Sequence, residues 1–194
     1  MKKYILTLIF CWFIFQAFGQ TENELINFNE QRKQITKIGM LTLGGWAISN
    51  IAVNGLLMTK ASGSRYYFYQ MNTFWNIVNL GLAGFGYYNS LQIAPETLTL
   101  STSTDEFYGF QKTLLLNAGL DVAYLAGGIY LLEKAKNNKK NSERFTGYGR
   151  GLILQGAFLL VFDTVLYFIL DAHSNELLPL LSGSANGMGL RLRF

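Results

Sequence analysis

Two aspartates interrupt otherwise uncharged apolar stretches of this chain, Asp121 within residues 113–132 and Asp163 within residues 151–170. Carboxyl groups in an apolar setting can bind a proton or a cation, and in hydrolases a pair can serve as acid and base. If both stretches are helices of opposite direction, a rise of about 1.5 Å per residue places the two carboxyl groups at one level. Because like charges repel in a poorly solvated site, we expect one of the two to carry a proton at neutral pH.

Amide and aromatic polar side chains accompany the aspartates at helical spacing. In each apolar stretch these polar side chains recur at steps of three, four or eight residues, which places them in a row on one helical face. The rows also contain Trp46 and Asn72. Amides donate and accept hydrogen bonds together, so they can bridge helices in lipid. Such a network can serve only to hold helices together, or it can form an ion site. The predicted intramembrane polar network is Asn50, Asn54, Asn76, Asn79, Asn117, Asp121, Tyr124, Gln155, Asp163 and Tyr167.

The elements that must position these side chains are four long apolar stretches. The 194 residues are 50% hydrophobic and only 14% charged, a composition that favours a membrane protein over a soluble domain. Each stretch has about the 20 residues needed to cross a hydrocarbon core ~30 Å thick. We therefore predict an all-α, polytopic membrane four-helix bundle over residues 38–171, with spans at about 38–59, 71–91, 113–132 and 151–170.

The amino terminus has the three parts of an export signal. Basic residues 1–3 precede an apolar run, and the small-x-small sequence Ala17, Phe18, Gly19 ends it. We predict a cleavable signal peptide at residues 1–19 followed by a periplasmic segment at residues 20–37; an uncleaved anchor is the alternative. The single cysteine, Cys11, lies inside this signal.

Loop charges predict the orientation. The loops after the first and third spans are basic, whereas the loop after the second carries Glu96, Asp105 and Glu106. Because basic loops stay in the cytoplasm, both mature termini should be periplasmic and the protein should lie in the bacterial inner membrane. The outer membrane is the less favoured alternative. The expected partners are the lipid bilayer and a membrane protein or a second copy of the chain.

The chain lacks the residues that several classes of function require. One histidine, His173, and one cysteine leave no zinc motif and no His-based catalytic triad, so we expect no enzyme activity, no metal and no cofactor. The basic residues are not gathered on a recognition helix, so nucleic acid is not an expected partner.

The sequence also predicts the structure of two segments outside the spans. Residues 92–111 are rich in Ser and Thr and should form a solvated loop or a short hairpin. Residues 172–194 should form a periplasmic tail, extended at its end because Met188, Leu190, Leu192 and Phe194 alternate with Gly and Arg. A membrane β-barrel would need many such strands, whereas the rest of this chain supplies four helical spans, so we do not expect a barrel.

The export signal ending before Gln20, the four spans and the amide-rich run 72–79 resemble uncharacterised small membrane proteins of Bacteroidota. The resemblance implies a Gram-negative envelope and no particular activity. We expect a structural or accessory component of a cell-envelope assembly; the alternative is a small proton- or cation-coupled transport unit that uses Asp121 and Asp163.

Overall fold

The computed structural model describes residues 2–184 and gives side-chain surroundings for residues 22–181. Every element in this described part is helical, which confirms the all-α class. The elements are α1 (Lys2–Met58), α2 (Gly63–Gln92), the short 3-10 helix η1 (Pro95–Thr97), α3 (Leu100–Lys136), α4 (Ser142–His173), the 3-10 helix η2 (Ser174–Glu176) and α5 (Leu177–Ser184).

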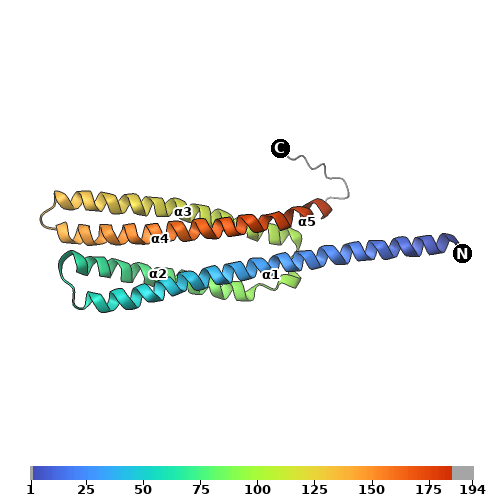
Figure 1. The fold of residues 1–194 in the computed structure, drawn as a ribbon, viewed down its shortest axis with the longest axis horizontal. Helices are drawn as coiled ribbons and strands as arrows, with labels where there is room; N and C mark the ends of the chain where they lie inside the picture. The colour runs from blue at the N-terminus through green and yellow to red at the C-terminus, as the bar shows by residue number, and fades with distance from the viewer. Residues whose placement is uncertain (1, 185–194) are drawn as a thin grey trace.

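The four long helices form two hairpins, α1 with α2 and α3 with α4, which meet mainly along α2 and α4. Figure 1 shows the hairpin connections at residues 59–62 and 137–141 together at one end, which we call the loop end. The α2–α3 connection, with η1, and the short helix α5 lie at the opposite end, the η1 end (Figure 1). Each hairpin therefore runs in the same sense.

Glycines of α4 allow this helix to pack closely on two neighbours. A methyl group at Gly149 would lie 2.8 Å from the backbone oxygen of Gly128 in α3, and one at Gly151 would lie 2.9 Å from Cβ of Met71 in α2. Real Cβ atoms do not approach other atoms so closely, so larger residues would push the helices apart. Small residues at such positions are a common device for helix contact in membranes.

A hydrophobic cluster lies toward the η1 end, where α5 continues beyond α4 and packs against α1 and α3 (Figure 1). Phe28 of α1 stacks on His173 at the end of α4, with ring centroids 4.6 Å apart, and lies 5.3 Å from the ring of Phe107 in α3. Burial of large side chains from four helices holds this end together. The cluster comprises Phe28, Phe107, Leu114, Leu166, Leu170, Leu177 and Leu180.

Three segments of the described part are long and apolar enough to cross a membrane: Glu22–Met58, Leu100–Lys136 and Ser142–Leu181. The predicted four-helix arrangement is confirmed, but α2 does not reach this level of apolar content. Its buried face carries the amides of Asn72, Asn76 and Asn79. Its outer face is apolar nevertheless, with Phe74 62% and Phe85 68% exposed.

One sequence prediction was wrong. Residues 100–111 were expected in a loop but form the first three turns of α3, because Thr99 caps the helix by accepting a hydrogen bond from the backbone N–H of Thr102. Residues 177–184, within the predicted C-terminal tail, form α5, whose Leu177 and Leu180 are buried in the hydrophobic cluster. The strand predicted near Phe194 lies outside the described residues.

Candidate functional site

Asp121 and Asp163 lie side by side in the interior of the bundle. Asp121 is 2% exposed on α3 and Asp163 is 6% exposed on α4. The two side chains line one cavity together with Asn117, close enough for each carboxyl group to influence the other. The close approach has a local cause, since Gly156 of α4 packs against the backbone of Asp121, where a methyl group would lie 3.0 Å from the carbonyl oxygen.

The carboxyl pair borders a cavity of about 150 Å³ between the helices. Oδ2 of Asp121 is buried and has no hydrogen-bond partner. A cavity of this size has room for several water molecules, which would supply that partner. Its polar lining comes from Asn79, Asn117, Asp121, Tyr124 and Asp163, and its apolar lining from Leu43, Trp75, Val78, Leu82, Leu120, Leu159 and Phe162.

On the loop-end side of the cavity, amides form a bonded seam across three helices. Gln155 of α4 donates from Nε2 to Oδ1 of Asn72 on α2, and its Oε1 accepts a hydrogen bond of 3.3 Å from Nε1 of Trp46 on α1. Asn79 donates to Oδ1 of Asn76 at 3.5 Å, and Asn76 donates to the backbone oxygen of Asn72 at 2.8 Å. These side chains have their hydrogen-bond partners within the protein.

The remaining members of the predicted network have more local surroundings. Asn50 and Asn54 donate to backbone oxygens four residues earlier in α1, both at 2.9 Å, so they bridge no helices. Tyr124 borders the cavity and meets Trp75 edge to face, 4.6 Å between centroids. Tyr167 packs against the hydrophobic cluster and is not brought into the polar network.

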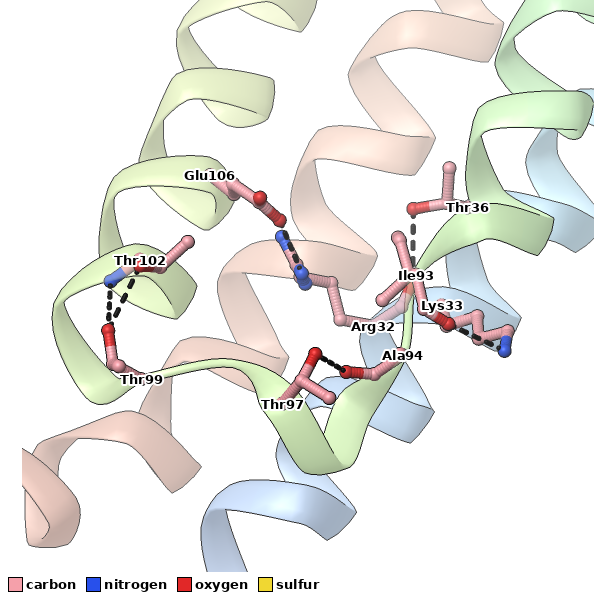
Figure 2. A network of polar contacts seen from close by, with 9 residues as sticks. All are labelled: Arg32, Lys33, Thr36, Ile93, Ala94, Thr97, Thr99, Thr102 and Glu106. Atoms are coloured by element: carbon pink, nitrogen blue, oxygen red, sulfur yellow. Dashed lines mark hydrogen bonds and ion pairs between the residues drawn. The ribbon is translucent and has the colours of Figure 1, made fainter.

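The prediction from sequence missed a polar group at the η1 end. Nη2 of Arg32 in α1 donates to Oε2 of Glu106 in α3 at 2.7 Å, although the Arg32 side chain is only 5% exposed. The neighbouring Lys33 points instead to the connection between α2 and α3 and donates to the carbonyl oxygen of Ile93 at 2.9 Å (Figure 2). The signal that could have revealed this region is the helical spacing of Ser103, Phe107 and Gln111, which share one buried face.

A larger groove of about 400 Å³ runs between α1 and α4, but it offers little chemistry. Its one polar lining side chain, Thr42, already donates to the backbone oxygen of Ile38. Ile38 and Val165 on its walls are 62% and 51% exposed, as expected for helix surfaces that face lipid. The groove is therefore a feature of the outer surface and does not extend the polar site.

The polar cavity supplies oxygen ligands and a place for a proton. Among the described residues, no group of three or more His, Cys, Asp or Glu side chains is arranged to hold a metal ion. The two carboxyl groups and neighbouring amide oxygens are hard donors, which suit a proton shared between acids or a hard cation. Paired acids alone, without a nucleophile nearby, do not define a hydrolytic site.

Comparison with known proteins gives one match. The family model of DUF6992, described as a family of unknown function, matches residues 42–164. This range includes the carboxyl pair and the amide seam, and it excludes Arg32. A search of the curated proteins and a search of the solved structures each found no match.

Proposed function

Because the chain belongs to DUF6992, whose function is unknown, we propose from its own geometry that it is a membrane protein that binds a proton or a cation between Asp121 and Asp163. One observation carries the proposal: the two buried carboxyl groups line one cavity, and Oδ2 of Asp121 has no hydrogen-bond partner there. Ionisable residues at membrane depth are expensive to bury and usually mark an ion pathway. Polar groups that serve only as structural bridges have their hydrogen bonds satisfied, as the Gln155 seam does.

In this proposal all four long helices cross the bacterial inner membrane. Both ends of α2 adjoin helices that are apolar enough to span, so α2 crosses with them although its buried face is amide-rich. The loop end faces the cytoplasm because it carries the basic run Lys134 to Arg150, and the η1 end carries Glu96 and Asp105. An export signal removed after Gly19 fits this orientation; intact-mass measurement of the membrane-extracted protein would show a chain beginning at Gln20.

The experiment is flux in liposomes. Purified protein is reconstituted into vesicles containing a pH-sensitive dye, and a potassium gradient with valinomycin sets the membrane potential. We expect the pH inside these vesicles to change faster than in empty vesicles. The variants Asp121→Asn and Asp163→Asn should lose this difference. Asp105→Asn, an exposed acid of the same helix α3, is the matched control and should retain the flux. Wild-type vesicles that behave like empty ones for protons, sodium and potassium would exclude a transport role.

A second candidate is a structural or accessory component of an envelope assembly. It is favoured by the closed amide seam and the glycine contacts of α4, which suit a rigid bundle, and by the lack of any non-helical domain among the described residues. Purification in mild detergent with identification of co-eluting proteins tests it. A scaffold should keep its partners in Asp121→Asn and Asp163→Asn.

A further inference from the structure

Four deeply buried side chains near the η1 end carry polar atoms that have no partner in the protein. They are Nδ2 and Oδ1 of Asn29, Nε of Arg32, Oγ of Ser103 and Nε2 of Gln111. The exposed fractions of these residues are 0%, 4%, 0% and 6%. Folded proteins leave few buried polar groups unpaired, and internal water is the usual partner when no protein group is available.

These side chains lie in one region of the fold. Asn29 directly follows Phe28, and Ser103 and Gln111 lie one helical turn on either side of Phe107. The rings of Phe28 and Phe107 are 5.3 Å apart. We call Asn29, Arg32, Ser103 and Gln111 the outer polar cluster.

The amides on the loop-end side of the carboxyl cavity differ from the outer polar cluster in their hydrogen bonding. Asn72, Asn76 and Gln155 are each 0% exposed, as deeply buried as the outer polar cluster, but each makes hydrogen bonds within the protein. Water is therefore needed as a partner on the η1 side of the cavity and not in the amide seam.

A layer of leucines separates the outer polar cluster from the carboxyl cavity. On α3, Leu114 lies between Gln111 and Asn117; on α4, Leu166 and Leu170 follow Asp163. The three leucines are 2%, 4% and 0% exposed and belong to the same hydrophobic cluster. A closely packed apolar layer stops water, and with it ions, until it widens.

We propose that the outer polar cluster binds internal water and that Leu114, Leu166 and Leu170 form an apolar gate between this water and the carboxyl cavity, so that the cavity is reached from the η1 end. The role of the gate in ion access rests on the proposed function of Asp121 and Asp163. The binding of water does not, because it follows from the unpartnered atoms alone.

Thiol reactivity tests the proposal without measuring flux. In a Cys11→Ser background, single cysteines replace Ser103, Asn76 or Asn117, and the rate of reaction with a small charged methanethiosulfonate is measured in detergent micelles. We expect Ser103→Cys to react several-fold faster than Asn76→Cys, although both positions are fully buried. Equal rates, or a faster rate at Asn76, would overturn the hydrated outer cluster.

The gate is tested by adding a second substitution to Asn117→Cys. Leu114→Ser should raise the reaction rate several-fold, with Leu114→Ala as a milder second variant. Leu177→Ser is the matched control, since Leu177 is 0% exposed in the same hydrophobic cluster but lies on α5. A rate unaffected by either Leu114 variant, with unfolding still cooperative, would overturn the gate. If the thiol results hold but the aspartate variants keep full flux, only the proposed function fails.

Discussion

Gln155 on α4 and Asn72 on α2, 83 residues apart in the chain, are joined by a hydrogen bond on the face where the two hairpins meet. Nε2 of Gln155 donates to Oδ1 of Asn72, and Trp46 of α1 donates to the other end of the same glutamine amide. One side chain therefore connects three helices in the interior of the bundle.

Gln155→Leu should lower the free energy of unfolding by about 1–3 kcal/mol. Interhelical hydrogen bonds in membranes contribute only ~0.6 kcal/mol on average, but the substitution also leaves Asn72 and Trp46 with buried unpaired groups. Unfolding in detergent, followed by circular dichroism, measures the change. Thr73→Val is the control, since the Thr73 hydroxyl bonds only to the backbone oxygen of Tyr69. Gln155→Leu and Asn72→Leu can also be combined in a double-mutant cycle. If their effects on the free energy of unfolding were strictly additive, the result would contradict a direct coupling between the two side chains.

Gly149→Ala should destabilise the α3–α4 contact by about 1–3 kcal/mol, because the added methyl group meets the backbone oxygen of Gly128 and the helices must separate. Gly81→Ala and Gly84→Ala are the controls, as nothing lies within 4 Å of a methyl group at either position. They should be neutral or stabilising by up to ~1 kcal/mol, the difference in helix propensity. Thermal unfolding of the three variants in one detergent makes the comparison. Equal losses in all three would show that close packing at Gly149 is not the cause.

Asp121 and Asp163 should share one proton at neutral pH, because two charged carboxylates that are buried side by side in one small cavity repel each other. Infrared difference spectroscopy should show the C=O band of a protonated carboxylic acid, absent after either Asp121→Asn or Asp163→Asn. Asp105→Asn should leave the band unchanged. A wild-type spectrum without any protonated carboxyl band would contradict this prediction.

Glu106→Gln should destabilise the η1 end by about 1–2 kcal/mol. The substitution removes the carboxylate from a guanidinium that is 5% exposed, while the Glu106 side chain itself is 46% exposed and partly screened by water. Glu133→Gln serves as the control because its bridge to Lys136 joins two largely exposed side chains on one helix and should contribute little. Hydrogen exchange of residues 100–111 should increase in Glu106→Gln alone. The ion-pair explanation fails if both variants behave alike.

Cysteines in the two connections test the orientation. In the Cys11→Ser background, Thr99→Cys should react with a membrane-impermeant maleimide in cells with a permeabilised outer membrane, whereas Asn137→Cys should react only after the inner membrane is opened. Both expectations follow from basic residues at the loop end remaining in the cytoplasm. The reverse labelling pattern would invert the proposed topology.

Much of the architecture was predictable because long uncharged stretches and 3.6-residue periodicity are local properties of a chain. They predicted four helices and placed the rows of amides on helical faces. The common level of Asp121 and Asp163 followed from antiparallel direction and helical rise, and the two side chains do interact.

The chain by itself could not tell which helix faces meet. Asn72 and Gln155 carried the same sequence signal as Asn50 and Asn54, but the first two bridge helices and the last two bond within α1. The start of α3 was hidden for a related reason: its Ser- and Thr-rich first turns look solvated, and Phe107 is buried by side chains of distant helices, among them Phe28 and His173. Burial and hydrogen-bond partners depend on packing between segments far apart in the chain, so the tertiary structure alone decided which polar residues are bridges and which form a cavity.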